Sequence, residues 1–289
     1  MTNEASVPRF ERPYDTGHLD ETVRTRGSAI LVDAFPAELR ARACAEIDQW
    51  LDEHGDADGD AFAGISRGPK ALRLQALLSK LRCAPELITQ PDVLAWARRM
   101  LAPRGTRVLL NAAEYLEREP DESAGQETQG NHRGTDLWPP VPAATHPVAV
   151  HAIVALVPFT AGNGGVWLAM DSHRLAAGER PDPRSLVRVL MEPGDAVLFR
   201  SDVIHGAGAN VSGERRRALS VGYQVDWLRP AENNTLNVSP RTAAGLPEEV
   251  QELLGYGTDT VLGRYEAGAA KAALTRPRRG VRPAAAAAG

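Results

Sequence analysis

His132 and Gly134 are the two residues of this chain whose types and spacing say most about its chemistry. An iron site that activates oxygen is commonly held by two histidines and one carboxylate, an arrangement that leaves coordination positions open. The first histidine and the carboxylate usually stand two residues apart, because residues i and i+2 of a strand point to the same face, roughly 6–7 Å apart. Gly134 stands at the carboxylate position and has no side chain to donate. The sequence therefore predicts a two-histidine site that lacks the usual carboxylate.

The next carboxylate along the chain belongs to Asp136, four residues after His132. On an extended strand Asp136 would lie roughly 13 Å from His132, too far for both residues to bind one metal ion. A sharp turn between them would shorten that distance. Asp136 therefore remains an alternative third ligand.

The second histidine is predicted in the stretch that follows a Pro-Gly turn. Residues 195–200 form an apolar strand there, and His205 comes shortly after it. Arg216 follows eleven residues later, between Arg215 and Arg217, and the alternation of a strand predicts that these two neighbours face the other way. An arginine stays charged and can bind a carboxylate through two hydrogen bonds.

This order of residues resembles the phytanoyl-CoA dioxygenase-like family of iron(II)/2-oxoglutarate oxygenases over most of the chain. The resemblance implies a mainly β fold with flanking helices, the cupin-like jelly roll or double-stranded β-helix. It implies His132 and His205 as iron ligands, and Arg216 as the residue that binds the far carboxylate of 2-oxoglutarate. By their position in the family, Gln129 and Trp167 are further expected contacts of 2-oxoglutarate.

A His-x-Gly motif, with the second histidine and the arginine retained, is the pattern of the halogenase subtype of that family. There a chloride ion takes the place of the carboxylate, restores the negative charge at the iron and can be transferred to the substrate. The resemblance therefore implies Fe(II), 2-oxoglutarate, O2 and chloride as cofactors, and chlorination of an unactivated carbon. Two alternatives remain open: a hydroxylase with Asp136 as its third ligand, and a non-catalytic binding protein. The second leaves the retention of His205 and Arg216 unexplained.

The expected substrate is a small molecule. A freestanding protein of this type resembles the nucleotide halogenases of chlorinated nucleoside antibiotic pathways, which implies a purine (deoxy)nucleotide. Cationic side chains that would then bind phosphate are Arg67, Lys70, Arg73 and Arg133, the first three at or beside a Gly- and Asp-rich loop that could act as a lid. A solvated helix start is the simpler explanation of the three charges beside the loop, and no phosphate-loop motif is present. A free amino acid and an alkaloid-like molecule are the other candidate substrates.

Short strands separated by Gly and Pro turns dominate residues 105–228, which with the metal motif favours a jelly roll. His151 lies inside one apolar strand, and we interpret it as a core or pocket-lining histidine. Strands are predicted at 27–33, 107–116, 148–157, 165–169, 187–190, 195–200 and 216–227, and helices at 36–55, 70–82, 91–102 and 247–254. The predicted organisation is an arm at 1–26, one domain at 27–256 and a tail at 257–289, disordered from about residue 276.

Composition limits the classes of partner. The chain has 289 residues, 43% of them hydrophobic, which is enough for one large core. The net charge of -4 gives no general attraction to a nucleic acid polymer or an anionic membrane. Because no apolar run approaches the ~18 residues of a membrane span and no leader is evident, we expect a cytoplasmic protein. The two cysteines, Cys44 and Cys83, are expected to be free, buried thiols.

Overall fold

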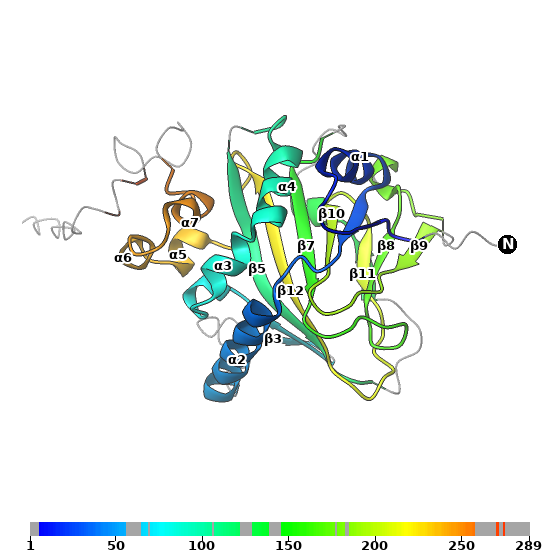
Figure 1. Ribbon diagram of the computed structural model, residues 1–289, viewed down its shortest axis with the longest axis horizontal. Coiled ribbons are helices and arrows are strands. Elements are labelled where there is room, and N and C mark those ends of the chain that lie inside the picture. Colours follow the sequence, from blue (N-terminus) through cyan, green and yellow to red (C-terminus); the bar gives the residue numbers. More distant parts are fainter. Residues whose placement is uncertain are drawn as a thin grey trace, which may run out of the picture.

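Two β-sheets face each other and enclose the interior of the molecule (Figure 1). The computed structural model describes residues 6–55, 65–68, 70–105, 107–121, 129–138, 146–176, 178–182, 185–257, 270–271 and 274. The large sheet has the strand order β1 (Arg9–Phe10), β2 (Ser28–Leu31), β10 (Ala196–Arg200), β7 (Ala149–Ala155), β12 (Arg216–Val225), β5 (Val108–Arg118), β4 (Ala71–Leu74), β3 (Ile65–Gly68). The small sheet has the order β6 (Gln129–His132), β11 (His205–Ala207), β8 (Val166–Ala169), β9 (Leu186–Arg188).

The space between the sheets is filled by side chains that alternate along the strands. Ile153 of β7 and Phe199 of β10 pack there with Val166 and Leu168 of β8 in one buried cluster. Since successive residues of a strand point to opposite faces, the residues between them face outward. This packing of a large against a small sheet, both mainly antiparallel, is the predicted jelly roll, and the fold prediction is confirmed.

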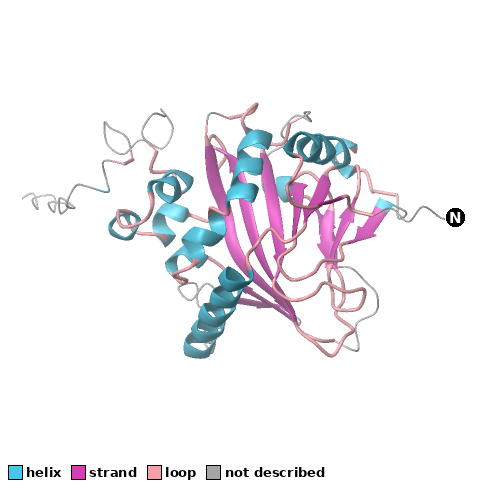
Figure 2. Cartoon of the chain, in the orientation of Figure 1, coloured by secondary structure: helices cyan, strands magenta, loops and turns pink. Residues whose placement is uncertain are grey.

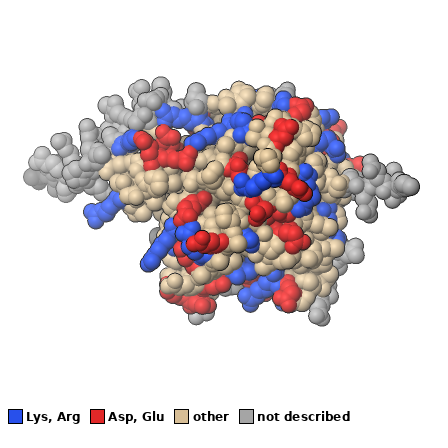
Figure 3. Space-filling view, viewed as in Figure 1, with Lys and Arg blue, Asp and Glu red and all other residues tan. Residues whose placement is uncertain are grey.

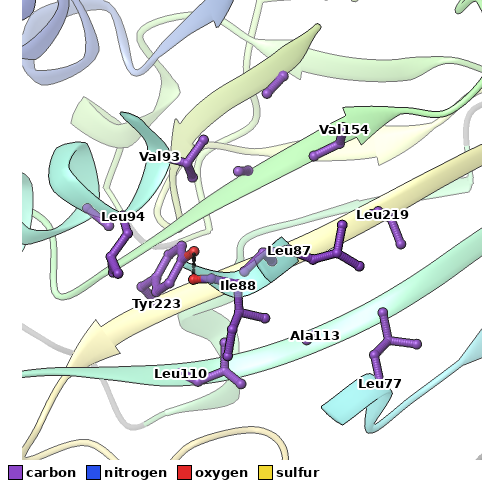
Figure 4. Close-up of a cluster of buried hydrophobic side chains, with 14 of the residues drawn as sticks. Leu77, Leu87, Ile88, Val93, Leu94, Leu110, Ala113, Val154, Leu219 and Tyr223 are labelled. Carbon is purple, nitrogen blue, oxygen red and sulfur yellow. Dashed lines mark hydrogen bonds between the residues drawn. The ribbon is translucent and has the colours of Figure 1, made fainter. Parts of the chain in front are cut away.

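Helices cover the outer face of the large sheet, where they form a second and larger core (Figure 2). Leu94 of α4 and Tyr223 of β12 belong to it, and the Tyr223 hydroxyl donates a 2.7 Å hydrogen bond to the carbonyl of Ile88 (Figure 4). The helices are α1 (Thr16–Arg26), α2 (Ala37–His54), α3 (Ala84–Ile88), α4 (Pro91–Leu101), α5 (Asn234–Asn237), α6 (Pro240–Ala243) and α7 (Glu248–Leu253), with 3-10 turns η1 (Leu77–Ser79), η2 (Gly134–Leu137) and η3 (Ser172–Arg174). The predicted helices near residues 36–55, 91–102 and 247–254 are thus confirmed.

The helix predicted at residues 70–82 is wrong. This segment forms β4 and then the short turn η1. Leu72 and Leu74 are buried while Arg73 between them is exposed, which is the period of a strand. Lys70 and Ala76 both have positive φ angles, 54° and 55°, a conformation that a right-handed helix cannot contain.

The N-terminal segment is not an arm lying loosely on the surface. β1 pairs in parallel with β2, and α1 buries Leu19 and Val23 against the outer core. The amphipathic spacing of these two residues was hidden by the many charged residues around them. Residues 9–26 are therefore integrated into the domain that we predicted to begin at residue 27.

Three further expectations can be compared with the structure. Cys83 is buried, Cys44 is half-buried, and both are free thiols. None of the described helices has the length and apolar composition that a membrane span requires. Charges of both signs are interspersed on the face drawn in Figure 3. Most of the predicted lid loop and nearly all of the predicted tail lie outside the described residues.

Candidate metal and anion site

His132 and His205 lie side by side on neighbouring strands of the small sheet. They are direct partners in the antiparallel pairing of β6 and β11, and their ring centroids are 4.4 Å apart. His205 also contacts Phe199 of the interior cluster, with a centroid distance of 4.9 Å, so it faces the space between the sheets, whereas His132 is exposed. Among the described residues no group of three or more His, Cys, Asp or Glu side chains is arranged to hold a metal ion. The two histidines thus stand as a pair.

The local structure orients His205 as a metal ligand. Its Nδ1 lies 3.0 Å from the carbonyl oxygen of Val203, and because a carbonyl only accepts, Nδ1 must carry the proton and donate it. Nε2 is then left with a free lone pair, the usual arrangement of a histidine that binds a metal. Burial lowers the pKa of His205 to about 4, so the ring is neutral at pH 7, as metal binding requires. The hydroxyl of Ser172 accepts a 2.8 Å hydrogen bond from the Ile204 N–H and fixes the residue next to His205.

The chain turns sharply after His132, at the start of η2. The premise that residues 132–136 are extended is therefore wrong. Even so, the Asp136 carboxylate is used by the backbone, because it accepts a 2.9 Å hydrogen bond from the Arg133 N–H. Gly134 is buried at the start of this turn and does not have a positive φ angle, so its backbone conformation is open to other residues.

The space beside Gly134 is bounded by Ser201 and His151. A Cβ on Gly134 would lie 3.3 Å from the Ser201 Cβ and 3.4 Å from the His151 Nε2. Ser201 is fully buried, and its hydroxyl has no hydrogen-bond partner among the described residues. The His151 ring stacks on Phe199, and burial lowers its pKa to about 3. His151 is therefore a neutral residue of this site rather than part of the apolar core.

Arg216 lies on the interior face of β12 and is 4% exposed. Its guanidinium is 5.3 Å from the centroid of the Phe159 ring, and its Nε has no partner among the described residues. Burial, and next the charge of Arg118, lower the pKa of Arg216 to about 10. As the strand alternation predicts, Arg215 and Arg217 lie on the other face, where they form ion pairs with Glu117 and Asp48 respectively. An anion would satisfy the buried Arg216, which fits the far carboxylate of 2-oxoglutarate.

The comparisons with known proteins agree with this geometry. The family model described as Phytanoyl-CoA dioxygenase (PhyH) matches residues 23–218, which is more than half of the chain. The chain belongs to the phytanoyl-CoA dioxygenase family. It is an oxidoreductase of the class of non-haem iron, 2-oxoglutarate-dependent dioxygenases.

Relatives of this phytanoyl-CoA dioxygenase family member cover most of its length. Dioxygenase olcK of Penicillium canescens is 26% identical over 80% of this chain and 78% of olcK. The iron/alpha-ketoglutarate-dependent dioxygenase penM of Penicillium thymicola is 24% identical over 86% of this chain and 81% of penM. Among solved structures, the epimerase SnoN in complex with Fe3+, alpha ketoglutarate and nogalamycin RO has a TM-score of 0.58 at 21% identity, and covers 73% of this chain and 83% of its own. This last similarity shows the shared fold.

The structure places the backbone of both expected 2-oxoglutarate contacts, Trp167 and Gln129, but describes only the Trp167 side chain. Leu168 is the partner of His205 in the β8·β11 pairing and faces the interior, so the neighbouring Trp167 faces the opposite side of the sheet. There the Arg188 guanidinium lies 4.6 Å from the Trp167 ring centroid. The contact of Trp167 with 2-oxoglutarate thus stays a prediction, and the direction of its side chain does not favour it. Gln129 pairs with Ala207 through β6, and its side chain is outside the described residues.

The four candidate substrate cations differ in their surroundings. Arg133 donates to the carbonyls of Ser172 and Leu175, at 3.2 and 3.1 Å, and so contacts the start and the end of the turn η3. Arg73 lies on the interior face of β4 and is 3.5 Å from the Glu114 carboxylate. Lys70 is exposed, and the Arg67 side chain is outside the described residues. Arg73 is therefore the candidate whose placement best suits a substrate.

A cavity of about 340 Å³ opens near the start of β5 and the C-terminal helices. Its volume is within the usual range for small-molecule sites. Neither histidine, nor Gly134, nor Arg216 lines it, so it is separate from the metal and anion site. Arg229 connects the two regions, since its side chain lines the cavity and its carbonyl accepts a 2.9 Å hydrogen bond from the Trp138 indole after η2.

Proposed function

We propose that this chain is an Fe(II)/2-oxoglutarate-dependent halogenase that chlorinates an unactivated carbon of a small molecule. The observation that carries the proposal is Gly134, which stands where the carboxylate ligand of this class is expected. The nearby Asp136 supports the proposal, because one oxygen of its carboxylate already accepts a hydrogen bond from the Arg133 N–H and is held against the backbone. A chloride ion on the Gly134 side would supply the missing negative charge.

Each residue of the site would have a distinct role. His132 and His205 would hold Fe(II), the latter with its tautomer fixed by the Val203 carbonyl. Arg216 would bind the far carboxylate of 2-oxoglutarate and thereby orient the other end of the cosubstrate towards the histidines. When bound, iron with 2-oxoglutarate, O2 and chloride supplies hydrogen abstraction from a substrate carbon and chlorine transfer to it. The protein's task is to exclude water and to hold that carbon closer to chlorine than to oxygen.

Several contacts support an active site over a decayed one. A decayed site has no need to keep the His205 tautomer fixed, nor to keep Arg216 buried with an unpartnered Nε. Burying a charged group without a partner is unfavourable, and a protein that keeps such a group usually needs it for function. The buried, unpartnered Ser201 hydroxyl beside Gly134 is a further donor that an anion could use.

A purine (deoxy)nucleotide is the substrate class that we favour. Arg73 supports it, since its side chain is exposed, on the face of β4 opposite to the buried Leu72 and Leu74. Its one ion-pair partner among the described residues is Glu114, at 3.5 Å. A surface ion pair of this kind contributes little free energy, so a phosphate could replace it.

Mass spectrometry tests the proposal directly. The protein is incubated with Fe(II), 2-oxoglutarate, O2 and a panel of nucleotides, once with chloride and once with bromide as the only halide. We expect a product with the chlorine isotope doublet in the first reaction and the bromine doublet in the second. Oxygenated product alone at high chloride, from a substrate that supports full succinate formation, would overturn the proposal.

A hydroxylase that uses Asp136 is the second candidate. It is favoured by the sharp turn at Gly134 and by the Asp136 charge, which is close enough to raise the pKa of His205 against the larger effect of burial. The relatives named as dioxygenases fit it as well. Loss of bound iron in Asp136→Ala, together with a hydroxylated product from the unaltered chain, would support this candidate.

A further inference from the structure

Arg118 and Arg216 are direct partners in the pairing of β5 with β12. Residues opposite each other in antiparallel strands have Cβ atoms roughly 4.5–5.5 Å apart on the same face. Both residues are buried, 8% and 4% exposed respectively. The Arg118 stem packs on Gly164, 3.2 Å from where a Cβ on that glycine would lie, so its side chain crosses towards the small sheet. The two guanidinium groups thus share one buried region between the sheets.

This arrangement is unfavourable without an anion. Like charges placed opposite each other in a sheet destabilise it, and burial strengthens the repulsion because little water screens it. The charge of each arginine should therefore be compensated nearby. A neutral carbonyl does so only in part.

The partners of the two side chains do not supply that compensation. The Arg118 Nε donates to the Gly208 carbonyl at a long 3.4 Å, and the Arg216 Nε has no hydrogen-bond partner in the part of the chain that the structure describes. Within the described chain, neither guanidinium has a carboxylate oxygen in ion-pair distance. Asp121 acts on Arg118 only at longer range, where its charge opposes the lowering of the Arg118 pKa by burial.

We propose that Arg118 is a second cationic residue for the far carboxylate of 2-oxoglutarate, and acts there together with Arg216. The dianionic cosubstrate then removes the repulsion between the two strands as it binds. Arg118 is a positioning and specificity residue in this role, since it contacts the end of the cosubstrate remote from the reacting carbon. The inference rests on membership of the 2-oxoglutarate-dependent class and is independent of whether the reaction is halogenation.

Two properties follow from a pair of arginines. First, the site selects molecules with a carboxylate at the far end, because a neutral end would leave both charges uncompensated. Second, part of the binding does not need the metal, since the arginines lie on the large sheet and the histidines on the small one. A five-carbon dicarboxylate without the 2-oxo group, glutarate, is therefore a suitable probe, and glutaramide, in which neutral amides replace both carboxylates, is its matched control.

The experiment measures binding and stability together. Full-length metal-free protein is titrated with glutarate and with glutaramide by calorimetry, and its Tm is measured with and without each compound. The variants are Arg118→Met, which keeps the apolar stem, Arg118→Lys, which keeps the charge, and Arg215→Met as an exposed arginine control directly before β12. 2-Oxoglutarate binding to the Ni(II)-loaded protein is measured in parallel.

We expect Arg118→Met to weaken glutarate and 2-oxoglutarate binding about tenfold or more, the usual effect of losing a charge-assisted hydrogen bond. The same variant should keep or raise the Tm of the ligand-free protein, because the repulsion with Arg216 is gone. Arg118→Lys should retain most of the binding, and Arg215→Met all of it. Wild-type affinity in Arg118→Met would overturn the proposal. So would a loss of affinity in both Arg118 variants that goes with a lower ligand-free Tm, since this would indicate a purely structural role.

Discussion

Substitution of Gly134 tests whether the position of the missing side chain is the halide position. The φ angle of Gly134 is not positive, so an L side chain requires no change of backbone conformation. Space is the limit, because a Cβ would lie 3.3 Å from the Cβ and carbonyl oxygen of Ser201 and 3.4 Å from the His151 Nε2. These neighbours must move by a few tenths of an ångström. Gly134→Asp adds a carboxylate there, and Gly134→Asn adds nearly the same volume without the charge.

We expect the crowding to cost about 1–3 kcal/mol, the range for atoms added to a packed region. In a domain of this size the Tm falls by roughly 2–4 °C for each kcal/mol. The two variants should therefore lose similar stability. Only Gly134→Asp should exclude chloride, because its carboxylate brings the negative charge that the halide otherwise supplies.

The assay compares bound iron, succinate and product mass over a range of chloride concentrations. Gly134→Asp should keep its iron and form succinate, while its product carries no chlorine isotope doublet at any chloride concentration. Gly134→Asn should retain a chloride-dependent product at reduced yield. Equal loss of chlorination in both variants, with iron retained, would refute the reasoning, because volume and not charge would then decide the outcome.

Four further outcomes are expected. Arg216→Ala should raise the 2-oxoglutarate concentration needed for succinate formation roughly ten- to hundredfold, for a loss of about 1.5–3 kcal/mol, whereas Arg215→Ala, whose side chain is exposed, should not; saturation of Arg216→Ala at the wild-type concentration would contradict this. Asp136→Ala should keep both iron and chlorinated product, because that carboxylate is hydrogen-bonded to the Arg133 N–H; metal analysis that finds no iron would identify it as a ligand. If the substrate is a nucleotide, Arg73→Ala should weaken nucleotide binding and leave 2-oxoglutarate binding unchanged. Equal affinity of the wild-type protein for the phosphorylated and the unphosphorylated compound would contradict the role of Arg73 in phosphate binding. Burial raises the pKa of Glu232 from 4.5 to about 7, so the native state binds more protons than the unfolded state between these two pH values. The free energy of unfolding should therefore fall as the pH rises through this window, by up to about 3 kcal/mol. In denaturant titrations at a series of pH values, the free energy of unfolding of Glu232→Gln should change less with pH.

The jelly roll was predictable because its strands carry their own signals. The apolar runs that became β7, β10 and β12 end at Gly, Pro or Asp residues, and each strand begins within one residue of its predicted start. The segment that became β4 was misread, because four residues are too short for a period of two to be distinguished from a helical one. What fixes it is its pairing with β5, far along the chain, which no local pattern reports.

The candidate site was predictable only where spacing along the chain determines it. The pairing of His132 with His205 and the burial of Arg216 agree with the interpretation of the sequence. Ser201 and Arg118 were missed, because each is brought to the site by contact with a segment that is distant in the sequence. Arg118 is the cross-strand partner of Arg216, so the two side chains share one face of the sheet. The sequence indicates this only when the pairing of β5 with β12 is already known.

The orientation of His151 depends on side chains that are absent. A Cβ on Gly222 would lie 2.8 Å from both the Cε1 and the Nδ1 of His151, so any larger residue would push the ring away. Gly222 is the β12 partner of His151, and Gly134 faces the opposite, Nε2 edge of the same ring. The imidazole therefore lies between two glycines: a Cβ on Gly222 would displace the ring, and a Cβ on Gly134 would touch its Nε2 edge at 3.4 Å. A larger residue at either position would change what borders the proposed halide position without removing a single ligand. The metal-binding residues alone therefore do not define this site, because the two glycines determine which atoms border the proposed halide position.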